Sequence, residues 1–307
     1  RPQDNRRYIQ AMRDFSRAVE AAAREALGAL SLTLLRHWDV GENAIVGRTR
    51  DYRDDPVSVC KIKLSQTKKH LYFPFRPLVF GGDDLTFVTD GRLGLSAAAA
   101  YLEAFEDAVK AQENTFLKNV RACAGISVVK AHYPFSRAYE LAEDLCHHAK
   151  EAWERRSALD WHFAATGLFG DIAAIRRRQY TIPARQLGLK PTSGNGRASY
   201  LEMRPVLLQE HPTLPESWRC WPSLARVVKT FLVEDEWRER HNKVIALRQA
   251  LRDGPSAVSR FRSAYGLETL PPLSASIAAL QHTGWDGGRC GYFDAVEALD
   301  FFLPLEG

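Results

Sequence analysis

The hydrophobic positions near the N-terminus repeat at the spacing of an α-helix. Between residues 6 and 35, apolar side chains recur every three or four positions, with Arg and Glu between them. They are Tyr8, Met12, Phe15, Val19, Ala22, Ala26 and Leu30. This pattern predicts a long amphipathic helix. Because such a helix in an α/β domain normally follows a strand, we expect either a domain that opens with a helix or a further segment upstream of Arg1.

Residues 71–90 follow a different pattern. Two β-prone apolar runs, 75–80 and 85–89, flank the cluster Gly81-Gly82-Asp83-Asp84. Apolar runs on either side of a short Gly/Asp segment predict a β-hairpin with a tight turn. Gly can adopt the positive φ angles that such turns need.

Two basic segments lack a clear hydrophobic period. Residues 37–70 are predicted to be a polar connection, and their lysines are Lys61, Lys63, Lys68 and Lys69. Residues 166–198 contain no acidic residue after Asp171, and positions 191–196 have the composition of a flexible loop. Such segments are most often solvated surface. The alternative is a ligand role for the lysines of 37–70, and a contact to RNA or a nucleotide for 166–198.

The rest of the chain alternates between helical and strand patterns. Predicted helices span 95–116 and 136–155, and predicted strands span 122–130, 157–165 and 200–208. The first of these strands should be a buried central one, and Pro205 places the last at an edge or bulge. Further helices are predicted over 223–233, 235–252, 255–265, 274–282 and 292–302. We therefore predict an α/β (α+β) domain over 1–209 and a helical domain over 210–307.

Composition narrows the classes of protein. The 307 residues are 45% hydrophobic and 26% charged with a formal net charge of +5, as in ordinary globular proteins. The chain has five cysteines without a C-x-x-C pair, so neither a disulfide framework nor a zinc knuckle is indicated. No stretch has the apolar length of a membrane span or the form of a signal peptide. We therefore expect reduced thiols, no membrane partner and a cytoplasmic location.

The adjacent carboxylates Asp83 and Asp84 are the main candidate for chemistry. Two carboxylates held close together repel each other unless a cation compensates them. Mg²⁺ bound by one or two carboxylates and by phosphate oxygens is common in nucleotidyl transfer. Since Gly81 and Gly82 lack Cβ, a nucleotide could approach the backbone closely. The alternative is that this tetrapeptide only forms a turn.

Other sites are less well supported. His147 and His148 lie on a predicted helix without a third ligand, so a surface or packing role is favoured. The sequence contains neither a G-x-S-x-G elbow nor a Walker P-loop. Lys150 could reach a phosphate, although a cation near the end of a helix also complements the helix dipole.

Three segments in order resemble a known family. VFGGDDLTFV, then AGISVVKAHYPFSRAYELAEDLCHHAK and then YLEMRPVLL lie within residues 71–208. In this order they resemble the palm domain of the large, polymerase-like subunit of type III CRISPR effector complexes and its stand-alone relatives. A GGDEF-type diguanylate cyclase is less similar, because Asp84-Leu85 stands where that family has Glu-Phe.

The resemblance implies a ferredoxin-like palm that converts ATP or other NTPs into a cyclic oligoadenylate or cyclic dinucleotide. It implies that Asp83 and Asp84 bind Mg²⁺ or Mn²⁺ and that Gly81 and Gly82 shape the nucleotide pocket. It also implies contacts from Ser136, Arg137 and Lys150 to the triphosphate. Two nucleotides must meet, so we expect a homodimer or a partner palm.

One departure from the family leaves the function open. The family's palm begins with a strand that carries another metal-binding Asp, and this sequence begins after that position. We expect the missing ligand on a strand before Arg1. Three interpretations follow: a nucleotide cyclase in antiviral defence, an inactive palm that binds nucleotide or RNA within a CRISPR-type ribonucleoprotein, and a structural subunit in which GGDD is only a turn.

Overall fold

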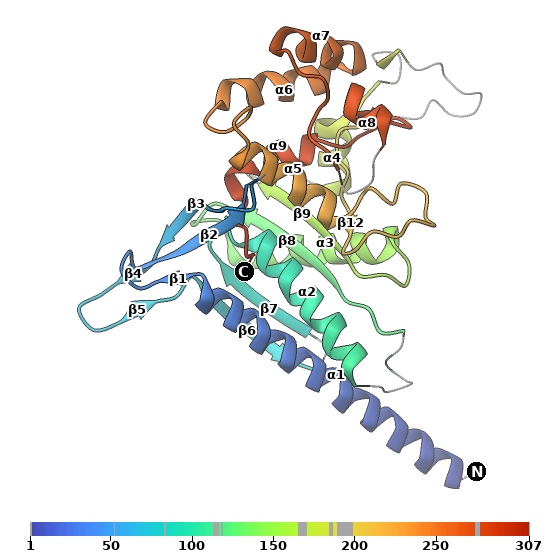
Figure 1. Cartoon of the computed structure of the whole chain (residues 1–307). Helices are drawn as coiled ribbons and strands as arrows, with labels where there is room; N and C mark the ends of the chain where they lie inside the picture. The colour runs from blue at the N-terminus through green and yellow to red at the C-terminus, as the bar shows by residue number, and fades with distance from the viewer. Residues whose placement is uncertain are drawn as a thin grey trace.

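The fold combines helices with several small sheets (Figure 1). A computed structural model describes residues 2–51, 53–82, 84–112, 117, 119–164, 171–183, 187–188, 199–273 and 277–306. This architecture confirms the predicted α/β (α+β) class. The domain boundary at residue 209 stays a prediction, although strand pairing crosses it, as described below.

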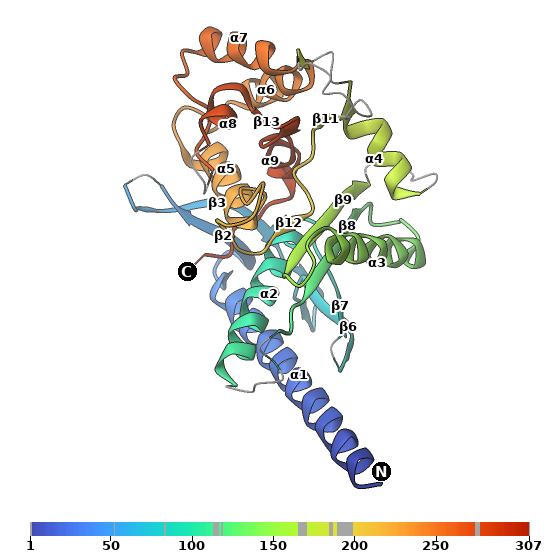
Figure 2. The same ribbon diagram turned by 90° about the vertical axis from the view of Figure 1, so that its right-hand side faces the viewer.

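The predicted N-terminal helix is present as α1 (Pro2–Arg36), which packs against α2 (Gly94–Ala111). The apolar stripe of α1 is buried from Val19 onward, and its alanines let the two helices approach closely. Gln112 Nε2 donates to the carbonyl of Ala18 at 3.2 Å. The N-terminal part of α1 projects beyond this point (Figures 1 and 2), and Tyr8 is 67% exposed.

The predicted hairpin is also present. Strands β6 (Phe75–Gly81) and β7 (Asp84–Thr89) pair antiparallel, with Gly81 opposite Asp84. Phe75 and Phe87 lie against each other with ring centroids 4.9 Å apart. Cross-strand aromatic pairs of this kind help to fix the register of a hairpin.

Residues 37–70 are not the polar connection that we expected, because they form strands. The strands are β1 (Trp38–Asp39), β2 (Ala44–Arg50), β3 (Pro56–Lys63), β4 (Ser65–Gln66) and, just beyond this range, β5 (Leu71–Tyr72). The β2–β3 register shifts after Gly47, where a bulge leaves Val59 without a partner in the ladder. The bulge moves the buried side from odd to even positions of β3, so the alternation that identifies a strand is interrupted.

A second sheet has the order β12-β9-β8. Its strands are β8 (Cys123–Val129), β9 (Ala158–Ala164) and β12 (Val206–Leu207), and α3 (Phe135–Ala152) packs on β8. The prediction of β8 as a central strand was wrong, because within the described residues β8 lies at the edge of this sheet. Its side chains are mostly half-buried.

The predicted strand over 200–208 is interrupted. It forms β11 (Ser199–Tyr200) and β12, with the Arg204–Pro205 peptide between them. β11 joins a four-stranded sheet of order β10-β11-β14-β13, which contains β10 (Thr181–Ile182), β13 (Trp285–Asp286) and β14 (Arg289–Cys290). This sheet therefore pairs a strand before residue 209 with strands after it.

The described part of the basic segment 166–198 includes a helix that was not predicted. It contains α4 (Ile172–Tyr180), whose N-cap Asp171 accepts a hydrogen bond from the Ala173 N–H. Arg176 on this helix is buried, which contradicts a purely solvated basic loop. Positions 191–196 lie outside the described residues, so their predicted loop is not tested.

The C-terminal part is mainly helical, as predicted. Its helices are α5 (Trp221–Val233), α6 (His241–Asp253), α7 (Pro255–Tyr265), α8 (Ala278–Thr283), α9 (Phe293–Ala298) and the 3-10 helix η3 (Leu299–Phe301). Four tryptophans of this part are buried in the core, and they are Trp218, Trp221, Trp237 and Trp285. None of the described helices has the length and apolar character that crossing a bilayer requires.

The hairpin and the β8 edge are close together but are not paired. A Cβ on Gly91 would lie 3.1 Å from Val128 Cγ1, and one on Gly94 would lie 3.3 Å from Ile126 Cγ2. In the part of the chain that the structure describes, β7 pairs only with β6, and β8 pairs only with β9. Each strand therefore keeps one edge without a strand neighbour.

Candidate functional site

At the tip of the β6–β7 hairpin, Gly81 pairs with Asp84, and Gly82 follows Gly81. Gly82 has φ +63°, which a primed turn requires and which glycine adopts without strain. A Cβ placed on Gly81 or Gly82 would meet no atom within 4 Å. The tip is therefore open to a ligand, while Asp83 lies outside the described residues.

Asp84 is exposed at the start of β7, and its charge influences the pKa values of side chains on α3. The pKa of the Cys146 thiol is raised, mainly by burial and to a smaller extent by Asp84. Two positions further along β7, Thr86 hydrogen-bonds Tyr139, whose pKa is raised mainly by its hydrogen bond to Glu143. β7 therefore runs beside α3, with the hairpin tip toward the half of α3 that contains Cys146.

Gly125 positions α3 on β8, a role that the sequence reasoning missed. A Cβ at this position would collide with the backbone of Ala142 and Cys146. Ser127 Oγ donates to the Ala138 carbonyl at 2.8 Å, and Cys146 Sγ donates to the Cys123 carbonyl at 3.3 Å. A glycine inside an apolar strand pattern is the signal for such a close approach of backbones.

The three residues implied as triphosphate contacts lie at opposite ends of α3. Ser136 and Arg137 are exposed in the first turn, and Lys150 is exposed in the last turn. At 1.5 Å per residue, the two ends are roughly 20 Å apart. Lys150 lowers the pKa of the Cys146 thiol, against the larger effect of burial. Asp84 raises the pKa of Tyr139 as well as that of Cys146, so it faces α3 between its two ends, and Lys150 shares only Cys146 with it.

The donor atoms at the tip suit a hard cation. Asp84 offers exposed carboxylate oxygens, and Mg²⁺ is commonly bound by one or two carboxylates together with phosphate and water. Within the described ranges, no group of three or more His, Cys, Asp and Glu side chains could hold a metal ion. Of the two predicted metal ligands, the structure therefore describes one, Asp84.

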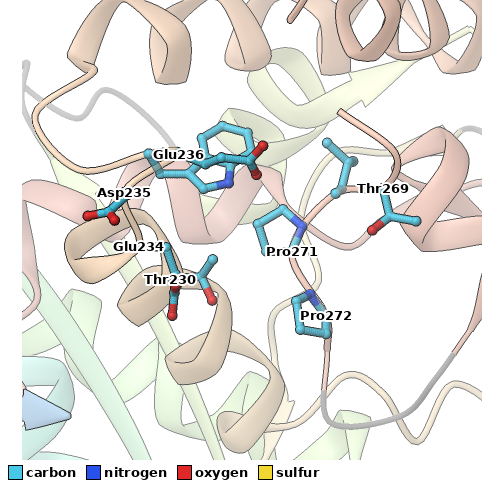
Figure 3. Close-up of a pocket in the computed structure, with 9 residues that line it drawn as sticks. Thr230, Glu234, Asp235, Glu236, Thr269, Pro271 and Pro272 are labelled. Carbon is cyan, nitrogen blue, oxygen red and sulfur yellow. The ribbon is translucent and has the colours of Figure 1, made fainter. Parts of the chain in front are cut away.

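Two cavities lie away from the hairpin. One of about 390 Å³, which Trp237 also lines, is shown in Figure 3, where Glu236 faces Pro271 while Asp235 points away. A larger one of about 510 Å³ lies between β2, α2, α5 and the C-terminal segment. In it, Lys229 pairs with Glu306, which also accepts a hydrogen bond from Thr49 at 3.0 Å. Neither cavity includes a predicted site residue.

A buried ionic cluster joins β9 to α4, and it was not predicted. Asp160 accepts hydrogen bonds from Arg176 and contacts His148 Nδ1 at 2.7 Å. Burial opposes ionisation of Asp160, but Arg176 holds its pKa below the usual value. The signal in the sequence was a carboxylate inside a predicted buried strand, since such a group needs a partner.

The cluster continues to the C-terminal part through Arg204. This fully buried side chain lies 3.4 Å from Asp294 and 3.3 Å from Glu297, both on α9. Its guanidinium also lies 4.7 Å from the ring centroid of Tyr180. Burial raises the pKa of Asp294 to about 6, although Arg204 lowers it. Because these side chains line no cavity described above, we assign the cluster a structural role.

Comparison with known proteins identifies the N-terminal half. A family model described as Cas10/Cmr2, second palm domain, matches residues 6–159, which are just over half of the chain. The match includes α1, the β6–β7 hairpin and α3. No curated protein gives a significant match. The resemblance to the palm of the type III CRISPR large subunit is thus confirmed, and the chain belongs to the Cas10/Cmr2 second palm domain family.

Proposed function

We propose that this chain is the palm of a nucleotidyltransferase that makes a cyclic oligonucleotide or cyclic dinucleotide from ATP or other NTPs. Palms of the family are nucleotidyltransferase-like in general. The observation that carries the proposal is the open hairpin tip, where exposed Asp84 lies beside α3 and acts, like Lys150, on the Cys146 thiol.

The side chains at the tip have distinct roles in this proposal. Asp83 and Asp84 would hold Mg²⁺ or Mn²⁺, and the bound ion would lower the pKa of an attacking ribose hydroxyl and neutralise charge on the phosphates. Gly81 and Gly82 leave room for the nucleotide beside the backbone. Lys150 neutralises charge on the triphosphate. A second nucleotide must face the first, so a second copy of this palm or another palm completes the reaction centre.

The open edges of β7 and β8 support a further part of the proposal. A strand between them would pair with both edges and bring its side chains close to the hairpin. We propose that such a strand contributes the additional carboxylate expected from the family pattern. The site would then hold two metal ions with three protein carboxylates.

The alternative is a palm that binds nucleotide or RNA as a subunit of a CRISPR-type ribonucleoprotein without catalysis. The observation that favours it is the lack of a three-ligand metal group in the described residues. The two functions differ in the chemistry that they predict, because only the first consumes nucleotide.

The test is incubation of the protein with ATP, or with mixed NTPs, in the presence of Mg²⁺ or Mn²⁺. Products are identified by mass spectrometry, and ATP affinity is measured by calorimetry in parallel. We expect cyclic products and release of pyrophosphate. Binding without turnover would support the non-catalytic palm. If the protein neither binds nor converts nucleotide, the hairpin is only a structural turn.

A further inference from the structure

A short β-arm projects from the sheet that contains β3. It is formed by β4 and β5, which pair through Ser65 with Tyr72 and Gln66 with Leu71. The turn between them is closed by hydrogen bonds from the Thr67 N–H to the His70 carbonyl and from the His70 N–H to Thr67 Oγ1. Figure 1 shows the arm at the left, away from the helices. These bonds hold the apex in a defined shape.

The charge of the arm has one sign. Residues 56–82 contain no Asp or Glu, and their cations are Lys61, Lys63, Lys68, Lys69 and Arg76. Lys61 pairs with Glu42 at 2.7 Å and is already neutralised. Lys68 and Lys69 lie exposed at the apex, and Lys63 lies exposed at the end of β3 that leads into the arm. Three exposed lysines therefore lie on this one projection of a chain whose formal net charge is only +5.

The arm also exposes an aromatic side chain. Tyr72 is 52% exposed, and its ring contacts the ring of His70 edge-on at a centroid distance of 6.4 Å. Leu71 beside it is 39% exposed. Neither Tyr72 nor His70 is buried by the fold, so the aromatic surface remains available to a partner.

We propose that this arm binds the backbone of a single-stranded nucleic acid, with Lys63, Lys68 and Lys69 on phosphates and Tyr72 stacked on a base. Lysines supply the affinity for phosphates, and an aromatic face stacks on bases of any sequence. A single strand fits better than a duplex, because stacking on Tyr72 needs an unpaired base. This surface is separate from the hairpin tip, and the proposal does not depend on the proposed cyclase activity.

The test is fluorescence anisotropy with a labelled single-stranded oligouridine in EDTA, so that no divalent cation engages the hairpin tip. The double variant Lys68→Ala/Lys69→Ala should bind roughly tenfold or more weakly at low salt. For this variant, the plot of log affinity against log salt concentration should be less steep by about 1.4, since each phosphate contact to a single strand contributes about 0.7 to the slope. Lys110→Ala/Arg260→Ala removes the same charge from α2 and α7 and should bind like the unmodified chain.

Tyr72 gives a second, charge-independent test. Tyr72→Ala should weaken binding roughly fivefold to a hundredfold, while Tyr72→Phe keeps the stacking face and should restore it. Equal affinities of the lysine double variant and its control would overturn the proposal. So would preference for a duplex of the same length, or binding to vesicles that contain anionic lipid but not to the oligonucleotide. The Asp83→Ala/Asp84→Ala variant should bind normally, which separates this result from the fate of the cyclase proposal.

Discussion

Arg176 on α4 holds Asp160 on β9 through two hydrogen bonds of 2.8 Å, Nη1 to Oδ2 and Nη2 to Oδ1. The same guanidinium donates to the Trp161 carbonyl at 2.7 Å. Both side chains are buried, so neither charge has water to replace its partner. α4 is therefore anchored to the sheet beside the family-matched region by one ionic contact.

Arg176→Met should destabilise the protein by about 3–5 kcal/mol, because it removes the guanidinium that compensates the buried carboxylate of Asp160. Urea unfolding followed by circular dichroism measures the change in free energy of unfolding. Arg177→Met, at the exposed neighbouring position, is the control and should change it by about 0.5 kcal/mol or less. Equal effects of the two substitutions would contradict the assigned role of Arg176.

His162 predicts a specific pH dependence of stability. Burial, with Arg204 and Arg176 nearby, lowers its pKa to about 3 in the folded protein. The unfolded chain takes up a proton near pH 6.5, so the stability that His162 contributes is present above that pH. This stability is lost as the pH falls from about 6.5 toward 3.

His162→Gln should therefore lose less stability on acidification than the unmodified protein, by about 1 kcal/mol per pH unit between pH 6 and 4. Asp294 acts in the opposite direction, because its raised pKa makes the folded state bind a proton that the unfolded state lacks. Comparing His162→Gln with the unmodified protein at each pH removes the contribution of Asp294, which both proteins share. Parallel pH profiles would show that His162 does not titrate in this range.

Two glycines should respond differently to alanine. Gly125→Ala forces a Cβ against the backbone of α3 and should cost about 3 kcal/mol or more, or prevent folding. Gly81→Ala meets open space and should change stability by about 0.5 kcal/mol or less. Thermal unfolding of both variants measures the difference. A stable Gly125→Ala protein would mean that α3 can move away from β8.

Asp83→Ala/Asp84→Ala should abolish formation of the cyclic product without changing the melting temperature appreciably. Asp84 is exposed, so its loss removes metal ligation but no packing. Product analysis by mass spectrometry and thermal unfolding are the two measurements. Asp107→Ala, an exposed carboxylate on α2, is the matched control and should retain activity. Normal activity of the hairpin double variant would exclude the proposed reaction centre.

Lys150→Ala should weaken ATP binding more than Arg137→Ala does. Lys150 and Asp84 both act on the Cys146 thiol, while Arg137 lies at the opposite end of α3 from Lys150. Calorimetric titration of ATP in the presence of Mg²⁺ gives both affinities, and we expect a loss of roughly tenfold for Lys150→Ala. A larger loss for Arg137→Ala would move the triphosphate to the N-terminal end of α3.

The helices could be predicted where a single stripe of apolar residues packs against one neighbouring element. Val19, Ala22 and Leu30 on α1 repeat at helical spacing and are buried. The hairpin was predictable because its turn residues and its two strands indicate the same structure. Strand β3 was not, since the bulge at Val59 changes which positions face inward.

The candidate site was predictable only in part, for a related reason. Asp84 and Lys150 are separated by many residues, and their common position near Cys146 depends on how α3 lies on β8. Arg176 cannot be distinguished from Arg177 by composition, because only the packing of α4 decides which guanidinium meets Asp160. Local pattern therefore specifies elements, while tertiary contacts specify which charges become buried.

The edges of β7 and β8 that have no strand partner among the described residues make protein concentration an experimental variable. Each edge presents backbone N–H and C=O groups that another strand can join, and Val79 and Val88 expose apolar surface on the same hairpin. Two copies of the chain can therefore associate through β-augmentation without any nucleotide between them. The fraction of such a dimer would rise with protein concentration and would not depend on ATP. Dimerisation through facing nucleotide sites would instead be strengthened by ATP.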